Sequence, residues 1–200
     1  MDIEKTLVHN TYDKIANHFS ETRFSVWDCV EEFKKNIKPN SIILDNGCGN
    51  GKNMNRKDCF YVGLDTCKSF IDIVYSKGHE CMIANCKKLP YLNDTFDYCI
   101  SIAVIHHIYN MQDRIECIKE MIRVTKSGGY ILISVWSKHK NYNFGDNIIP
   151  WNIRSTDIIV PRYYYLFTEN EVKQLVDGLN VDIVSLQNSK NNYFLTLLVR

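Results

Sequence analysis

Hydrophobic and polar positions recur with two different periods along the chain, and each period predicts one kind of element. Apolar residues at three- and four-residue spacing are typical of amphipathic helices. We expect helices over residues 7–19, 26–37, 69–76, 112–125 and 169–179. Short apolar runs between these segments predict buried strands. We expect strands over residues 41–45, 59–65, 80–86, 96–104, 128–136, 181–186 and 193–199.

The order of these elements predicts the fold class. Strands that alternate with helices favour an α/β fold with a mostly parallel sheet, here of seven strands, and helices on both faces. The last two strands follow each other without a helix, so one of them is expected to run antiparallel at or near an edge. Residues 137–166 show neither period clearly, and we expect an irregular segment there. A chain of 200 residues is long enough for one core, so we expect a single domain over residues 1–200.

Composition narrows the class of protein. Hydrophobic residues make up 45% of the chain and charged residues 24%, which is typical of globular proteins. No apolar run approaches the roughly 20 residues of a spanning helix, and the charged first ten residues lack the apolar core of a secretory signal. The eight cysteines form no Cys-x-x-Cys pair, so we expect reduced thiols, no metal site and a cytoplasmic protein. A net charge of +1 predicts weak binding to nucleic acid by this chain alone.

A glycine-rich stretch, ILDNGCGNGK at 43–52, follows the first predicted strand. Its glycines, Gly47, Gly49 and Gly51, have the spacing G-x-G-x-G. A P-loop needs a wider gap and a Ser or Thr after its lysine, and a nicotinamide fingerprint needs a third glycine where Lys52 stands. S-adenosylmethionine remains as the expected ligand, because glycines let a backbone approach it closely. The spacing alone also occurs in tight turns that bind nothing.

Polar residues at the ends of the next strands support a cofactor site, since ligands of such sheets bind beyond the carboxyl ends of the strands. Asp45 ends the first strand and is expected to attract the ligand's ammonium group. Asp65 ends the second and can accept hydrogen bonds from both ribose hydroxyls. Asn85 follows the third, and its side-chain oxygen can accept from the adenine amine. Ala103, at the end of the fourth strand, is also expected to contact the cofactor.

Several longer motifs are shared with one enzyme family. They are YDKIANHFSETRFSVW, DNGCGNGK, GLD, FDYCISIAVIHH, RVTKSGGYILISVW and RYYYLFTENEV. In order and spacing they resemble the eukaryotic tRNA methyltransferases that esterify 5-carboxymethyluridine at the wobble position. The resemblance covers nearly the whole chain, and SIAVIHH and RYYYLF are its most particular parts.

The resemblance implies a class I S-adenosylmethionine-dependent methyltransferase fold and a tRNA anticodon loop as substrate. It also implies a small zinc-ribbon activator protein as partner in a heterodimer. The parts of the domain are then amino-terminal helices (1–38), a cofactor-binding core (41–136), a substrate-side insertion (137–166), and a closing helix with strands (167–200).

The methyl acceptor in such a reaction is a carboxylate, which is ionised at neutral pH and needs no general base. Positioning is then the main task, and Arg23 and Arg162 are suitable clamps because a guanidinium binds a carboxylate bidentately. We expect His106 to face the site and His107 to pack or cap, since adjacent side chains point apart. Tyr163 is expected in the catalytic group. Arg23 has a plain alternative, a pair with a surface acid.

Other features discriminate among reactions and leave alternatives open. No Asn-Pro-Pro-Tyr or Asp-Pro-Pro-Tyr follows the fourth strand, which argues against methylation of nitrogen. No cysteine has an activated setting for attack on uridine carbon 5. Tyr165 stands where the family usually has a histidine, and Asn46 and Asn85 also depart from the family's pattern. A small-molecule methyltransferase and a non-catalytic cofactor-binding scaffold remain the alternative functions.

Overall fold

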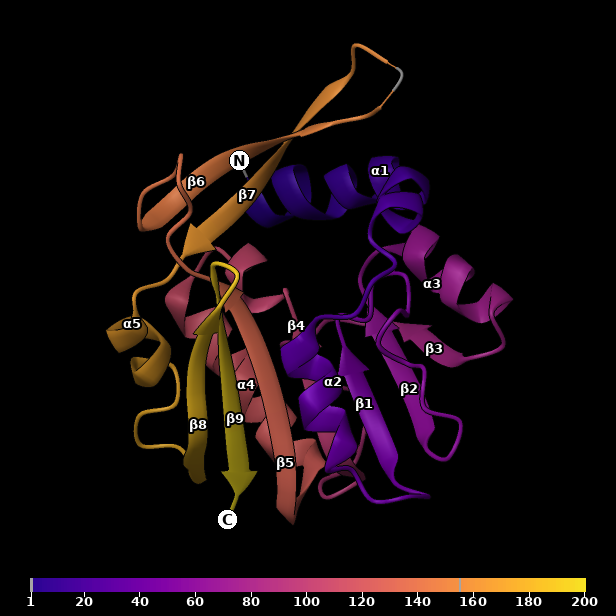
Figure 1. Cartoon of the computed structure of the whole chain (residues 1–200), viewed down its shortest axis with the longest axis vertical. Coiled ribbons are helices and arrows are strands. Elements are labelled where there is room, and N and C mark those ends of the chain that lie inside the picture. Colours follow the sequence, from indigo (N-terminus) through magenta and orange to yellow (C-terminus); the bar gives the residue numbers. More distant parts are fainter. Residues whose placement is uncertain (1, 155) are drawn as a thin grey trace.

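The centre of the molecule is a seven-stranded sheet with the order β3-β2-β1-β4-β5-β9-β8 (Figure 1). The structure is a computed structural model, and it describes residues 2–154 and 156–200. The strands of this sheet are β1 (Ile42–Asn46), β2 (Phe60–Asp65), β3 (Glu80–Ile83), β4 (Phe96–Ile102), β5 (Thr125–Trp136), β8 (Val181–Ser189) and β9 (Asn192–Val199).

Strand direction follows the expectation from the sequence. Strands β1 to β5 pair in parallel, whereas β9 runs antiparallel to β5 and β8 antiparallel to β9. The antiparallel strand β9 therefore lies next to the edge, as predicted. The chain proceeds outward from β1 to β3 and then returns to place β4 on the other side of β1. This reversal creates the crevice at the carboxyl ends of β1 and β4 in which α/β proteins bind ligands.

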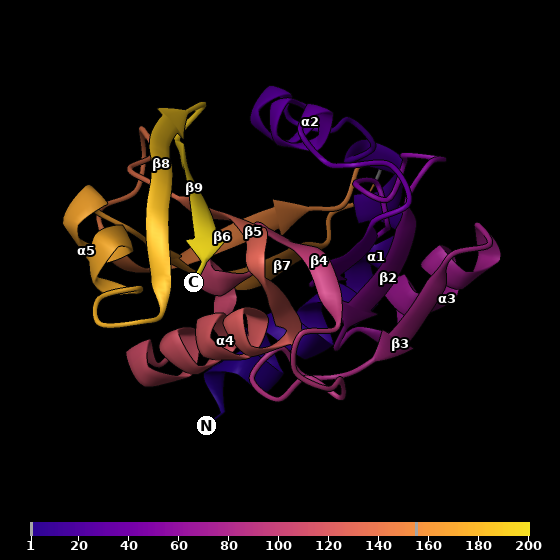
Figure 2. The same cartoon turned by 90° about the horizontal axis from the view of Figure 1, so that it is seen from below.

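Helices cover both faces of the sheet, and Figure 2 shows α2 and α4 on opposite sides. The helices are α1 (Asn10–Thr22), α2 (Asp28–Lys35), α3 (Lys68–Ser76), α4 (Met111–Val124) and α5 (Glu169–Gln174), with a π-helical turn η1 (Lys5–His9) and a 3-10 turn η2 (Ile105–His107). Within the part of the chain that the structure describes, no helix combines the length and the apolar character needed to cross a membrane.

Alternation along the strands divides the core into two layers. Leu44 and Cys99 pack with Ile118 of α4 on one face. Ile43 and Val74 of α3 pack on the other face. Because both faces of β1 are covered, its residues from Ile43 to Asn46 are all buried, which is why the strand is a continuous apolar run that ends in polar residues.

The prediction of an irregular segment over residues 137–166 is confirmed for residues 137–144 and wrong for residues 145–152 and 159–166, which form strands. Strands β6 (Gly145–Asn152) and β7 (Ile159–Leu166) pair antiparallel as a separate two-stranded sheet. Pro150 and Pro161 lie opposite each other in it, and proline is disfavoured in most strands, so the sequence signal was weak. Helix α5 and strand β3 are also shorter than expected.

The amino-terminal helix and the hairpin β6–β7 lie beyond the carboxyl ends of the parallel strands (Figure 1). Helix α1 contacts α3 and β7, so it bridges the two halves of this end of the molecule. Tyr12 and Ile15 of α1 pack with Phe70 of α3 and Trp151 of β6 in one apolar cluster. These segments form the upper wall of the site.

Candidate functional site

A cavity lies between the carboxyl ends of the strands, helix α1 and the hairpin β6–β7. Most of the residues predicted for the site line it: Arg23, Gly47, Gly49, Asp65, Asn85, Ala103 and Arg162. The other four lie outside its lining: Asp45, Gly51, His106 and Tyr163. The cavity therefore joins the predicted cofactor residues to both predicted arginines.

The glycine loop forms the floor of the cavity. Gly47 has a φ of +82°, and a Cβ there would lie 2.2 Å from a methyl carbon of Val104. Gly49 has a φ of +51°, but a Cβ on it would meet no protein atom within 4 Å. The left-handed conformation favours glycine at both positions. Gly49 additionally borders open space.

Asp65 is held in place by the loop backbone. Its Oδ2 accepts a hydrogen bond from the Gly49 N–H at 2.9 Å, and its Oδ1 accepts one from the Cys67 N–H at 2.9 Å. Burial raises the pKa of Asp65, and these backbone hydrogen bonds oppose that increase. Each carboxylate oxygen keeps a second lone pair, so Asp65 can still accept from a ligand.

Asp45 lies behind the loop and is completely buried. Among the described residues, neither of its carboxylate oxygens has a hydrogen-bond partner. Burial, together with the nearby Asp65 carboxylate, raises the pKa of Asp45 to about 7. An unpaired buried carboxylate is unfavourable, and the raised pKa of Asp45 reflects that cost.

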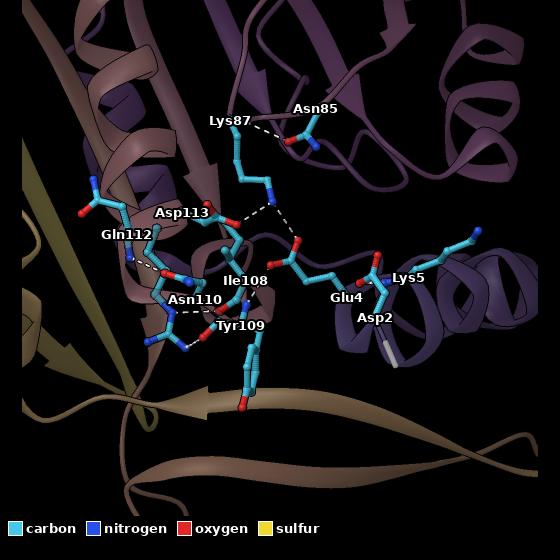
Figure 3. Close-up of polar contacts among 11 residues, drawn as sticks. Asp2, Glu4, Lys5, Asn85, Lys87, Ile108, Tyr109, Asn110, Gln112 and Asp113 are labelled. Atoms are coloured by element: carbon cyan, nitrogen blue, oxygen red, sulfur yellow. Dashed lines mark hydrogen bonds and ion pairs between the residues drawn. The ribbon is translucent and has the colours of Figure 1, made fainter.

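The third strand contributes Asn85, whose Oδ1 accepts a hydrogen bond from the Lys87 N–H at 2.9 Å. Figure 3 shows the side chain of Lys87 between two acids, with Nζ 3.2 Å from Glu4 Oε2 and 2.8 Å from Asp113 Oδ2. Glu4 also accepts from the Tyr109 N–H at 3.0 Å. This network fixes the start of the amino-terminal helix at the Asn85 end of the cavity.

Ala103 is one of the few non-glycine residues with a left-handed backbone, at a φ of +63°. Its N–H is bonded to Ser134 Oγ at 2.9 Å, which keeps it in this conformation. Such conformations persist where surrounding bonds hold them, often at functional sites. Here the conformation turns the chain into η2 at the cavity wall.

Arg23 and Arg162 converge on one aromatic ring. The central carbons of their guanidinium groups lie 4.9 Å and 4.7 Å from the Trp151 ring centroid. Within residues 2–154 and 156–200, neither arginine pairs with an acid, so the surface-acid alternative for Arg23 does not apply there. Arg162 is only 6% exposed, and its Nε has no partner among the described residues. Two guanidinium groups without acids favour an anionic ligand at this end.

The structure reverses the predicted roles of the two adjacent histidines. His107 lines the cavity, while His106 is completely buried beneath Tyr164, with ring centroids 4.9 Å apart. The Trp136 N–H donates to His106 Nδ1 at 3.1 Å. Successive residues of the turn η2 point in different directions, so only one can face the cavity. The sequence offered no means of choosing which.

The prediction for Tyr163 is corrected by strand alternation. In β7, Arg162 and Tyr164 point into the cavity, so Tyr163 points to the other side. Its hydroxyl donates to Asp146 Oδ1 at 2.6 Å and accepts from Arg114 Nη2 at 3.1 Å. Tyr163 therefore belongs to a supporting network behind the site.

Sequence reasoning missed several residues of the cavity wall. Tyr12 comes from α1 and Trp151 from β6, far apart in the chain from the glycine loop. Tyr12 belongs to an apolar stripe that looks like any core-facing helix position. Lys52 lies 5.2 Å from the Trp27 ring centroid, and in the sequence it stands out only as a mismatch to other motifs. The signal that could have found Tyr12 is its place in YDKIANHFSETR, a stretch shared with the enzyme family.

Comparisons with known proteins agree with this arrangement. Residues 44–133 match the family description "Methyltransferase domain". A tRNA (carboxymethyluridine(34)-5-O)-methyltransferase of Arabidopsis thaliana is 44% identical over 137 residues, which cover 68% of this chain and 34% of that protein. The enzyme of the same name from Schizosaccharomyces pombe is 31% identical over 97% of this chain and 96% of its own length.

The chain belongs to the tRNA (carboxymethyluridine(34)-5-O)-methyltransferase family. It spans only about a third of the length of several relatives, among them the Arabidopsis protein. A solved complex of the Haloferax volcanii Trm112 methyltransferase activator with a methyltransferase has the same fold. Its TM-score is 0.71 at 12% identity, over 96% of this chain and 97% of that one.

The match to a methyltransferase domain supports S-adenosylmethionine as the cofactor of this chain. The space beside Gly49 is open, and Asp65 and Asn85 of the cavity lining carry side-chain oxygens that can accept hydrogen bonds from a ligand. The expectation of a class I methyltransferase fold with a seven-stranded, mostly parallel sheet is confirmed.

Proposed function

We propose that this chain transfers the methyl group of S-adenosylmethionine to the carboxylate of 5-carboxymethyluridine at the wobble position of tRNA. The observation that carries the proposal is the buried Arg162, which lacks an acidic partner among the described residues and lies with Arg23 against Trp151. A buried guanidinium is stabilised by a bidentate anion, and a carboxylate matches its geometry.

The residues of the cavity divide between cofactor and acceptor in this proposal. Asp65 accepts from the ribose hydroxyls, Asn85 faces the adenine, and Asp45 attracts the ammonium group. Gly47 and Gly49 allow the close approach of the loop. The bound cofactor supplies an electrophilic sulfonium methyl group, and its positive charge is lost when the methyl leaves.

The acceptor end needs only to orient its substrate. A carboxylate oxygen forms a bond to the methyl carbon as the carbon–sulfur bond breaks, which yields a methyl ester and a neutral thioether. No proton moves in this step. Arg23 and Arg162 therefore hold the carboxylate without removing its reactive lone pair, and an in-line approach gives most of the acceleration.

A zinc-ribbon activator protein is part of the proposal, together with the cytoplasmic location expected from the sequence. The Haloferax complex, in which a methyltransferase of the same fold is bound to an activator protein, supports such a partner. Strand β3 of this chain also supports such a partner, because β3 lies at one edge of the sheet and exposes Met82 and Ile83. An edge strand with exposed apolar side chains offers unpaired backbone groups to a partner.

The function is tested by measuring methyl transfer from labelled S-adenosylmethionine to tRNA that lacks the ester. The reaction is run with and without the zinc-ribbon protein, and digested nucleosides are analysed by mass spectrometry. We expect a base-labile methyl ester on carboxymethyluridine. Arg162→Ala should lower kcat/KM at least about 100-fold, because it leaves the acceptor unclamped. Arg200→Ala, at an exposed ion pair with Asp182, is the matched control.

The result can also contradict the proposal. If the cofactor binds and no nucleoside gains a methyl group with the partner present, a small-molecule acceptor becomes the better hypothesis. If neither tRNA nor any small acceptor is methylated, the chain is a cofactor-binding scaffold.

A further inference from the structure

Four side chains at the acceptor end of the cavity are joined by hydrogen bonds, and their hub is Tyr12. The Tyr12 hydroxyl lies 2.9 Å from His107 Nε2, 3.2 Å from the Tyr164 hydroxyl and 3.4 Å from Arg162 Nη1. Arg162 Nη1 also donates to the Tyr164 hydroxyl at 2.7 Å. The hub therefore comes from the amino-terminal helix, and its partners come from η2 and β7.

The backbone fixes the direction of the protons in this network. His107 Nδ1 lies 2.8 Å from the Tyr163 carbonyl oxygen, which can only accept, so Nδ1 carries the proton. Burial, with a smaller contribution from Arg162, lowers the pKa of His107 to about 3, so its Nε2 is a free acceptor. Tyr12 then donates to Nε2 and turns its oxygen lone pairs toward Arg162.

This arrangement holds one edge of the Arg162 guanidinium and leaves the rest available. Both tyrosine oxygens near Nη1 act as acceptors. Arg162 lines the cavity, so the part of its guanidinium that faces the cavity offers N–H donors at the acceptor end. A carboxylate satisfies such donors. A carboxamide of the same shape can turn its NH₂ group toward them, and a buried donor facing a donor is costly.

We propose that Tyr12 is a positioning residue that acts through Arg162, and that the Tyr12–His107 pair makes the site select an ionised carboxylate over a carboxamide. The inference rests on the proposed function and names a specificity element of the same site. Tyr12 touches neither reacting atom in this scheme. It keeps the guanidinium against Trp151 in the orientation that accepts the substrate.

Tyr12→Phe removes only the hydroxyl and keeps the ring that packs on Phe19 and Phe70. We expect kcat/KM for tRNA to fall about 10- to 100-fold, as for other lost positioning contacts, while cofactor affinity measured by calorimetry changes less than about twofold. Tyr61→Phe is the matched control, because its buried hydroxyl lies in the layer against α3 and has no partner among the described residues.

A double-mutant cycle separates positioning from general support of the fold. In an Arg162→Ala background, Tyr12→Phe should change kcat/KM less than about twofold, since the group it acts through is absent. If the double variant instead loses kcat/KM by the product of the two single-variant factors, the inference is overturned. The same variants are compared for inhibition by tRNA that carries the carboxamide at the wobble position. Tyr12→Phe should narrow the preference for carboxylate over carboxamide about tenfold.

The outcomes distinguish this inference from the function on which it rests. A wild-type chain that transfers no methyl group to tRNA, with the partner present, overturns the proposed function and the inference with it. An active wild type with an equally active and equally selective Tyr12→Phe variant overturns the inference alone.

Discussion

At the scale of single residues, two buried groups of opposite charge have no ion-pair partner among the described residues, one beside the cavity and one in its wall. Asp45 lies unpaired behind the glycine loop, and Arg162 lies at the acceptor end without an acidic partner among the described residues. Each would be stabilised by an ion pair with the other kind of group, yet the fold keeps them at different ends of the site. In the proposed function, these two positions serve ligands of different charge, a cationic cofactor and an anionic acceptor.

Asp45 should couple stability to pH. Its pKa is raised to about 7 from an ordinary value near 3.8, so the folded protein binds a proton that the unfolded chain has already lost between these values. Stability without cofactor therefore falls as pH rises from about 4 to 7. Asp45→Asn should raise the Tm at pH 8 by roughly 5 °C and much less at pH 5, while weakening the binding of S-adenosylmethionine. Scanning calorimetry at both pH values tests this, and an equal Tm gain at both would contradict it.

Asp65 offers a second test of the cofactor end. Asp65→Asn keeps the shape but replaces one carboxylate oxygen by a donor, which faces either the Gly49 or the Cys67 N–H. We expect the Kd for S-adenosylmethionine to rise at least about 30-fold, because the loop and the ribose lose their shared acceptor. Calorimetric titration measures it. Asp72→Asn, at an exposed ion pair on α3, should leave the Kd unchanged. An unaffected Asp65→Asn would remove this residue from the site.

His107 predicts the shape of the pH profile. The groups that face it are Tyr12, Arg162, Tyr164 and His106, and with a pKa of about 3 it stays neutral above pH 5. At saturating cofactor, kcat should be flat from about pH 5.5 to 8.5, because the acceptor carboxylate is also ionised there. An inflection near pH 6.5 that disappears in His107→Ala would instead indicate proton transfer by this histidine.

At the scale of elements, the two edges of the main sheet differ in what they offer. Strand β3 ends one edge and β8 ends the other. Both expose aliphatic side chains, but β3 is short and lies beside the Asn85 end of the cavity, where Lys87 and Glu4 hold the amino-terminal helix. A partner on β3 is therefore placed to influence the cofactor end.

Substitution of one exposed isoleucine on each edge strand tests which edge binds the partner. Ile83→Lys places a charge on the β3 edge and should weaken binding of the zinc-ribbon protein at least about tenfold, since a charge buried at an interface is costly. Ile183→Lys makes the same change on β8 and should have little effect. Surface plasmon resonance with each variant gives the two affinities. If both variants weaken binding of the zinc-ribbon protein equally, or if neither does, β3 is not the binding edge.

At the scale of the whole molecule, charge limits how the chain meets its substrate. The net charge is +1, and of the two arginines of the cavity Arg162 is buried while Arg23 is exposed. Binding to a polyanion through phosphate contacts needs basic surface, and this chain has little excess of basic residues.

The salt dependence of tRNA binding follows from this balance. The slope of log Kobs against log salt should be shallow for the isolated chain and steeper for its complex with the zinc-ribbon protein, because each phosphate neutralised adds about 0.9 or less to the slope. Filter binding between roughly 50 and 200 mM salt measures the two slopes. Proteins that contact many phosphates lose affinity strongly over this range. Identical slopes would mean that the partner adds no phosphate contacts.

The sequence by itself determined the order of the elements of the main sheet, its parallel core, and the glycine loop with Asp45, Asp65 and Asn85 at or just after successive strand ends. These depend on local periodicity and on the rule that parallel strands present their ends at one edge. Only the tertiary structure decided that His107 rather than His106, and Tyr164 rather than Tyr163, face the cavity. It also brought Tyr12 to Arg162, which lies 150 residues away in the chain. Side-chain direction in a short turn or in an unrecognised strand shifts completely with one residue of register, and register is set by pairing between distant segments.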